Sequence, residues 1–132
     1  MMAPEVYQRA RAQAQMHLQL CRTGSRDDAR AGRIEGRVVR IFRDREHQLH
    51  WGQRLSLSVP IIERNSREPI APSGTIYLDG DYLGAARWFE AFVEFWDGRF
   101  QLVHSQICPI RRPTRAPVCG PDQEGFLCEG NL

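Results

Sequence analysis

The dipeptide Asp97-Gly98 is the feature of this sequence that most constrains its fold. Asp-Gly favours the two positive-φ positions of a type I′ turn, so the flanking residues are expected to form a β-hairpin. Aromatic and β-branched residues, which favour strands, crowd both flanks. Pairing across this turn sets the following residues opposite one another: Trp96 and Arg99, Phe95 and Phe100, Val93 and Leu102, Ala91 and His104.

The segment before this turn fits two structures. Residues 82–96 place apolar side chains at helical spacing, with Asp81 as a candidate N-cap. The second half of the segment is rich in aromatic and β-branched residues, which favours a strand. We predict a helical turn over residues 82–86 followed by a strand over 87–96, and a continuous helix over 82–96 is the alternative.

Two earlier segments alternate with the period of a strand. Residues 33–43 carry apolar side chains on both faces, and residues 54–62 alternate apolar and polar side chains cleanly. Pro60 cannot donate to a neighbouring strand, so it marks an edge or a strand end. Residues 75–78 predict a further short strand after a polar loop.

The two ends of the chain differ from this middle part. Residues 4–22 place apolar residues at spacings of three and four, which predicts a helix, and residues 22–32 have the composition of a polar linker. Residues 113–132 are rich in Pro and Gly and predict a disordered tail. At 132 residues the chain suits one domain, over 33–112. We expect a mainly β fold: a small five-stranded antiparallel OB-like barrel or curved sheet with an N-terminal helix.

Charge and hydropathy exclude several classes of protein. The 18 basic residues, all Arg, exceed the 16 acidic ones by only two, so net charge alone does not predict a polyanion partner. The absence of Lys is explained by codon bias. No apolar run reaches the roughly 18 to 20 residues of a membrane span, and the N-terminus lacks the apolar core of a secretory signal. We expect a soluble cytoplasmic protein without a membrane partner.

The residues that carry catalysis or bind metals form no known motif here. The four cysteines contain no C-x-x-C pair, and we interpret them as reduced thiols, although Cys119 and Cys128 are able to oxidise to each other. A metal site with the H-x-x-H pair at 47 and 50 is a weaker hypothesis. The sequence contains no G-x-S-x-G, no Gly-rich phosphate loop and no H-E-x-x-H. We therefore predict a non-catalytic protein without a cofactor or metal; an enzyme would need His47 or His104 close to Asp79 or Asp81.

Arginine and aromatic residues supply the candidate interaction surface. We expect a binding module that holds a protein partner through an exposed strand edge, the Arg-bearing segment 37–43 and the aromatic hairpin. The alternative is single-stranded nucleic-acid binding on the same surface, which requires its members to cluster on one face. The candidate residues are Arg37, Arg40, Arg43, Arg87, Trp96 and Arg99.

Several runs resemble those of known small barrels. They are G-R-V-V-R-I-F-R at 36–43, L-x-x-G-x-x-L-S-L-S-V at 49–59, R-W-F-E-A-F-V-E-F-W-D-G-R-F at 87–100 and Q-I-C-P-I-x-x-P-T at 106–114. Together these runs resemble small uncharacterised bacterial proteins with an OB-like barrel of five strands, over about residues 33–114. Similar strand and turn patterns occur in netrin-like barrels, but the disulfide cysteines of that secreted family have no counterparts in these strands. The resemblance therefore implies a fold and no active-site residues.

Overall fold

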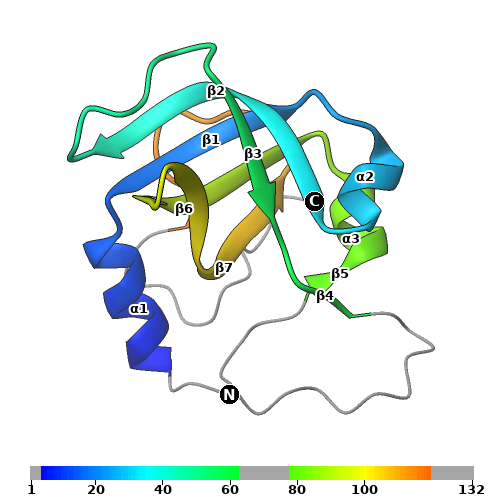
Figure 1. Ribbon diagram of the computed structural model, residues 1–132, viewed down its shortest axis with the longest axis horizontal. Helices are drawn as coiled ribbons and strands as arrows, with labels where there is room; N and C mark the ends of the chain where they lie inside the picture. Colours follow the sequence, from blue (N-terminus) through cyan, green and yellow to red (C-terminus); the bar gives the residue numbers. More distant parts are fainter. Residues whose placement is uncertain (1–3, 63–77, 120–132) are drawn as a thin grey trace.

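A curled β-sheet is the framework of the molecule, and the computed structural model describes it within residues 4–62 and 78–119. Five antiparallel strands run in the order β3-β2-β1-β6-β7 (Figure 1). They are β1 (Met16–Arg22), β2 (Arg33–Asp44), β3 (Arg54–Ser58), β6 (Trp88–Trp96) and β7 (Arg99–Ile110). The sheet curls so far that its edge strands, β3 and β7, approach each other. The predicted mainly β fold with a curved five-stranded sheet is confirmed, whereas the OB-like assignment stays a prediction.

Short helices and a second strand pair complete the described chain. They are α1 (Pro4–Gln13), α2 (Arg26–Arg30), α3 (Gly80–Ala85) and the parallel strands β4 (Ile61–Ile62) and β5 (Leu78–Asp79). Helices α2 and α3 pack together at one end of the sheet (Figure 1). A Cβ on Gly80 would come within 2.2 Å of the Arg30 carbonyl oxygen, and one on Gly84 within 2.3 Å of Arg30 Cγ. Glycine is therefore required at both positions for the helices to come this close.

The central strand corrects our prediction for the N-terminus. The helix expected over residues 4–22 ends at Gln13, and residues 16–22 form β1, which pairs with β2 on one side and β6 on the other. Neighbouring strands and covering segments bury both faces of β1, so polar residues alternate with apolar ones inside the protein. The ordered fold thus begins well before Arg33, and the expected linker contains α2.

The hairpin at Asp97-Gly98 confirms the predicted turn. Both turn residues have positive φ, 52° and 77°, as a type I′ turn requires. The three predicted pairs next to the turn are confirmed: Trp96 and Arg99, Phe95 and Phe100, Val93 and Leu102.

Farther from this turn a bulge changes the register. Ala91 lies opposite Ile107, not opposite His104 as the unbroken pairing predicts. His104 and Ser105 have φ values of 49° and 56°, so the extra residues of β7 are accommodated there. His104 is consequently exposed and does not lie on the apolar face, which corrects the second part of the hairpin prediction.

The predictions for the other strands are confirmed in their main points. Helix α3 ends at Ala85 and β6 begins at Trp88, so the turn-then-strand interpretation of residues 82–96 holds. The predicted strand over 33–43 is β2. The strand predicted over 54–62 ends at Ser58, directly before Val59 and Pro60. Most of the strand predicted over 75–78 lies outside the described residues.

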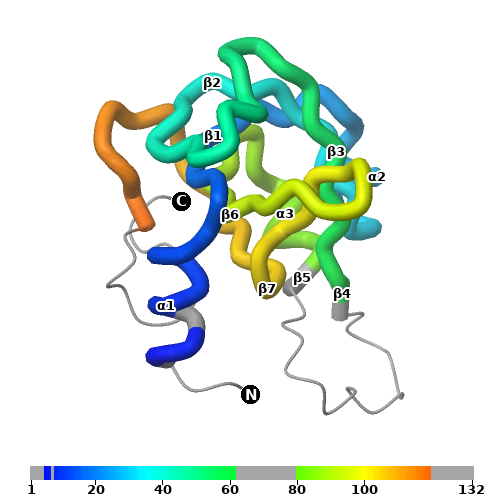
Figure 2. Tube along the Cα trace, turned by 60° about the vertical axis from the view of Figure 1, so that its left-hand side comes forward, coloured from blue at the N-terminus to red at the C-terminus, as the bar shows by residue number. Residues whose placement is uncertain are grey.

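The two faces of the sheet are covered differently. The inner face, toward which the sheet curls, carries a core of apolar residues: Met16, Leu18, Leu20, Ile34, Val38, Leu55, Leu57, Phe89, Ala91, Val93 and Ile107. The outer face carries the alternate residues of the same strands, including His17, Gln19 and Glu90. Helix α1 and the segment that follows β7 both contact this outer face, and they lie on the same side of the molecule (Figure 2).

The segment after β7, residues 111–119, is called the strap here. The predicted disorder over 113–132 is wrong for residues 113–119, because Thr114, Val118 and Cys119 bond to side chains of the sheet. Cys119 is buried in a second apolar cluster with Phe92, Cys108 and Ile110. Residues 120–132 lie outside the described residues.

Candidate functional site

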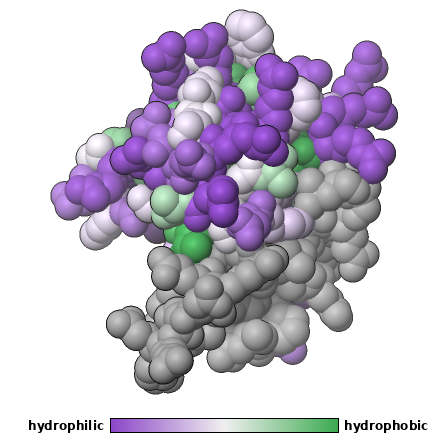
Figure 3. Space-filling model, turned by 90° about the vertical axis from the view of Figure 1, so that its right-hand side faces the viewer, coloured by the Kyte–Doolittle hydropathy of each residue, from purple (hydrophilic) through white to green (hydrophobic). Residues whose placement is uncertain are grey.

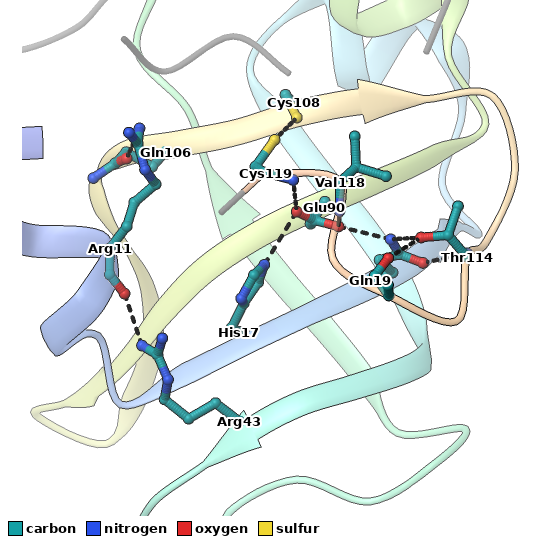
Figure 4. A network of polar contacts seen from close by, with 11 residues as sticks. Arg11, His17, Gln19, Arg43, Glu90, Gln106, Cys108, Thr114, Val118 and Cys119 are labelled. Atoms are coloured by element: carbon teal, nitrogen blue, oxygen red, sulfur yellow. Dashed lines mark hydrogen bonds and ion pairs between the residues drawn. The ribbon is translucent and has the colours of Figure 1, made fainter. Parts of the chain in front are cut away.

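A buried carboxylate organises the outer face of the sheet (Figure 4). Glu90, in the middle of β6, is 1% exposed. On β1, His17 donates from Nε2 to Glu90 Oε2 over 3.1 Å, and Gln19 donates from Nε2 to Oε1 over 2.7 Å. The strap donates the backbone N–H of Val118 to Oε1 over 2.9 Å and that of Cys119 to Oε2 over 2.5 Å. Four donors from two segments therefore converge on one carboxylate.

These donors decide the charge of Glu90. Burial by itself raises the pKa of the Glu90 carboxyl, because it disfavours the charged form. The hydrogen bonds from His17, Val118, Gln19 and Cys119 outweigh this effect and leave the pKa below its usual value. The carboxylate is ionised and satisfied, and it is closed to solvent. Its role is to hold the strap on the sheet rather than to act on an external ligand.

Gln19 fixes the strap at a second point. Its Nε2 donates to the Thr114 hydroxyl over 2.8 Å, and its Oε1 accepts the Thr114 backbone N–H over 2.8 Å (Figure 4). Thr114 therefore lies directly over β1, next to the strand β2. Sequence reasoning missed both Gln19 and Glu90, because a polar residue that is buried by a distant segment looks like an exposed one in the sequence.

Two bulges in β2 place its arginines on the outer face. If side chains alternated strictly along β2, Arg40 would lie on one face of the sheet and Arg37 and Arg43 on the other. Register shifts at Val39 and Phe42 prevent this, so that Arg37, Arg40 and Arg43 lie opposite Cys21, Gln19 and His17 of β1.

Arg43 has a structural role on that face. Its guanidinium donates to the carbonyl oxygens of Arg11 and Ala14, over 2.7 and 2.9 Å, at the C-terminal end of α1 (Figure 4). Arg45 adds a bond to the Ala12 carbonyl over 3.0 Å. Cations are favourable at this end of a helix. Burial, and secondarily the charge of Arg45, lowers the pKa of Arg43. Arg43 therefore anchors α1 and is not part of an open surface.

Arg37 and Arg40 remain exposed, and Arg54 of β3 lies beside them. Arg54 pairs with Arg37 across the two strands, so both point to the outer side. Within residues 4–62 and 78–119, no carboxylate forms an ion pair with Arg37, Arg40 or Arg54. Like charges side by side without counter-charges favour an anionic ligand.

Trp51 is an exposed aromatic residue that sequence reasoning missed, and its backbone runs alongside β2. The loop between β2 and β3 folds back along β2, where Gly52 N–H donates to the Val38 carbonyl over 2.8 Å. Trp51 comes directly before this contact, at the level of Val39 and Arg40, and it is 74% exposed. The sequence signal was available, since a single Trp in a charged loop is unlike the aromatics of the hairpin.

The strap adds two more arginines to this region. Arg112 and Arg115 are exposed and flank Thr114, which lies over Gln19 and thus next to Arg40. We call the group formed by Arg37, Arg40, Trp51, Arg54, Arg112 and Arg115 the basic surface.

The other predicted surface residues lie elsewhere. Trp96 and Arg99 form a pair at the tip of the hairpin. Arg37 and Trp88 both pair with Cys21, so they lie at the same level of the sheet. Trp96 is eight residues farther along β6, which places it roughly 26 Å from that level at the rise of a strand. Arg87 lies 5.2 Å from the Trp88 ring and is occupied in that contact. The six residues of the predicted surface thus do not form one cluster.

The residues considered for metal binding or catalysis are also dispersed. His47 and His50 are exposed in the loop after β2. Asp81 pairs with Arg30 over 3.0 Å on the exposed side of α3. Viewed from the side of α2 and α3, the described surface is mainly hydrophilic (Figure 3). Among the described residues no three His, Cys, Asp or Glu side chains are grouped to hold a metal ion.

Cysteines 108 and 119 are close together. Their Sγ atoms are 2.9 Å apart between β7 and the strap, whereas Cys21, on the outer face of β1, is free. Cys108 is therefore a candidate partner for Cys119, whereas Cys128, the partner considered from the sequence, lies outside the described residues.

Comparisons with known proteins were made at three levels. No protein family, no curated protein and no solved structure matches this chain. No helix in the described part of the chain is long and apolar enough to cross a membrane. The suspected OB-like resemblance therefore stays a prediction, and the arguments for function depend on the geometry above.

Proposed function

We propose that this chain is a non-catalytic binding module that holds single-stranded nucleic acid on its basic surface. The observation that carries this proposal is the alignment of Arg37, Arg40 and Arg54, exposed and without ion pairs among the described residues, beside the exposed Trp51. The proposal keeps the chemistry of the arginine and aromatic surface predicted from sequence, and it moves the aromatic part from the hairpin tip to the β2–β3 loop.

The residue types suit a flexible polyanion. Arginine offers a planar fork of donors that matches phosphate oxygens, and several arginines in succession follow a phosphate backbone. An exposed indole provides a stacking surface for a base, with little dependence on sequence. Arg112 and Arg115 on the strap extend the positive charge across the sheet. Duplex recognition has less support, because within residues 4–62 and 78–119 no long helix or ribbon projects from this face to enter a groove.

A protein partner remains the second candidate. Its support is the exposed Trp96 at the tip of the hairpin, 70% accessible and distant from the basic surface. An exposed Trp next to an Arg is a frequent anchor in protein interfaces. The two candidates thus use different residues, so matched variants separate them.

Fluorescence anisotropy with labelled 20-nucleotide DNA and RNA tests the proposal. We expect binding that weakens steeply with salt, because phosphate contacts release counterions. Arg37→Ala and Arg40→Ala should each reduce the salt slope by about one, and Trp51→Ala should weaken binding by about 5-fold or more. Trp96→Ala and Arg99→Ala are the matched controls and should leave binding unchanged.

Three results would contradict this function. They are absence of binding at low salt, equal losses for the Trp51 and Trp96 variants, and equal competition by a poly-aspartate peptide of matched charge. The last result would favour an acidic protein partner.

A further inference from the structure

The strap is held on the sheet by contacts at separate points along its length. Beyond Ile110, hydrogen bonds hold it at Thr114 and at the backbone N–H groups of Val118 and Cys119 (Figure 4). Its apolar contribution to the cluster on the outer face comes from Val118 and Cys119. Residues 111–119 form turns and bends and no helix or strand. Segments of this kind open at a lower free energy than the sheet beneath them.

A pair of cysteines lies where it would control this opening. Cys108 is on β7, and Cys119 is at the far end of the strap, with 2.9 Å between their Sγ atoms. The backbone N–H of Cys119 also donates to Glu90, so the cysteine is held in place by the same carboxylate that orders the rest of the site. Both side chains are buried, at 1% and 4% exposure.

We propose that Cys108 and Cys119 are a redox latch: oxidation to a disulfide locks the strap over His17, Gln19 and Glu90, and reduction releases its end. The disulfide closes a loop that contains the whole strap. With the cross-link, the Glu90 contacts cannot separate by movement of the strap alone. Without it, that end is held by non-covalent contacts, among them the two N–H groups that donate to Glu90. The latch does not depend on nucleic-acid binding.

The chemistry is ordinary thiol–disulfide exchange with a low-molecular-weight disulfide as oxidant. The Cys119 thiolate attacks one sulfur of that disulfide, which forms a mixed disulfide and releases one small thiol. The Cys108 thiolate then attacks the Cys119 sulfur, which forms the Cys108–Cys119 bond and releases the second small thiol. The two protons lost by the protein thiols pass through water to the two released thiolates, and the two electrons from the protein have reduced the oxidant to two thiols.

Disulfide mapping tests the cross-link on the full chain after equilibration with oxidised glutathione. Digestion with trypsin and a Glu-specific protease is needed, because cleavage after Glu124 separates Cys119 from Cys128. We expect a linked pair of peptides that contain Cys108 and Cys119, with Cys21 free to react with iodoacetamide. A Cys119–Cys128 link, or Cys108 and Cys119 both alkylated, would overturn the proposal.

Hydrogen exchange tests the effect on the strap. The amides of Val118 and Cys119 should exchange about 10- to 100-fold faster after reduction, and in the oxidised Cys108→Ser variant, than in the oxidised protein. Cys21→Ser is the control and should behave as the parent chain does in both redox states. Equal exchange rates in the oxidised and reduced parent would show that the strap does not respond to the latch.

Discussion

The inner face of the sheet and the part of the outer face around Glu90 are both buried, but different forces hold them. On the inner face, Met16, Leu18 and Leu20 of β1 pack against apolar residues of every other strand. On the outer face, His17 and Gln19 of the same strand are joined to Glu90 and the strap by hydrogen bonds. Apolar packing is not directional and tolerates changes of sequence, whereas a buried polar network is stable only when each member has its partner. The outer face is therefore the one that specifies where the strap docks.

The two faces also differ in what they present to solvent. The inner face carries the buried apolar core, toward which the sheet curls. The outer face has a covered part, around Glu90, and an open part, where Arg37, Arg40 and Arg54 face solvent. A strand that alternates between an apolar core and a polar face is thus able to support folding with one set of residues and binding with the other.

The largest expected effect comes from a truncation on the inner face. Leu20 lies over Gly36, where an added Cβ would come within 2.5 Å of Leu20 Cδ1. Leu20→Ala should lower the free energy of unfolding by about 2 to 5 kcal/mol, because it removes buried methyl groups and leaves a cavity. Urea denaturation measures this loss. The adjacent Cys21→Ala, on the outer face, is the control and should change stability by no more than about 0.5 kcal/mol. Equal losses would mean that the two faces do not differ as described.

A smaller effect is expected from the centre of the outer face. Glu90→Gln keeps the shape of the side chain but replaces one acceptor oxygen by a donor, which leaves a buried N–H group without its partner. We expect a loss of about 1 to 3 kcal/mol in urea denaturation. Glu94→Gln, four residues along the same strand and half-buried, should change stability by less than about 0.5 kcal/mol. A Glu90 variant as stable as the parent would show that packing alone holds the strap.

The smallest expected effect is the pH dependence of the difference in unfolding free energy between the parent and Glu90→Gln. The hydrogen bonds outweigh burial and place the pKa of Glu90 in the folded chain below its value in the unfolded chain. The stabilisation by its ionised form is therefore complete above the unfolded-state pKa and is lost as the pH falls through the lower, folded-state pKa. Unfolding free energies of the parent and Glu90→Gln should converge as the pH is lowered from 7 toward 3. A difference that is constant with pH would assign the effect to shape instead of charge.

The hairpin shows which parts of the fold were accessible from sequence. Asp97-Gly98 predicts the turn and the register of the neighbouring pairs correctly, because the positive φ of both residues is a local property. The same register fails beyond Val93, because the bulge at His104 and Ser105 depends on how β7 packs against the rest of the sheet. The helical turn before β6 is local as well, and it too is predicted correctly.

The candidate site was predictable only in its residue types. The arginine and tryptophan surface itself stays a prediction, but the structure shows that Arg43 anchors α1 and that Trp51 is, like Trp96, an exposed tryptophan. The residues next to Arg43 and Trp51 in the sequence do not indicate where either side chain lies. Arg43 is engaged by carbonyl groups about 30 residues earlier in the chain, which no local pattern reports.

By itself, the sequence determined the mainly β character, the turn at Asp97-Gly98, and the strand β2, since turn chemistry and period-two alternation act over a few residues. The tertiary structure alone decided that residues 16–22 form the central strand and that three arginines of β2 share one face. It also decided that the strap folds onto Glu90. The physical reason is the same in each case: a buried polar group, a bulge and a docked strap are all stabilised by partners far away in the chain, and those partners become neighbours only when the sheet has formed.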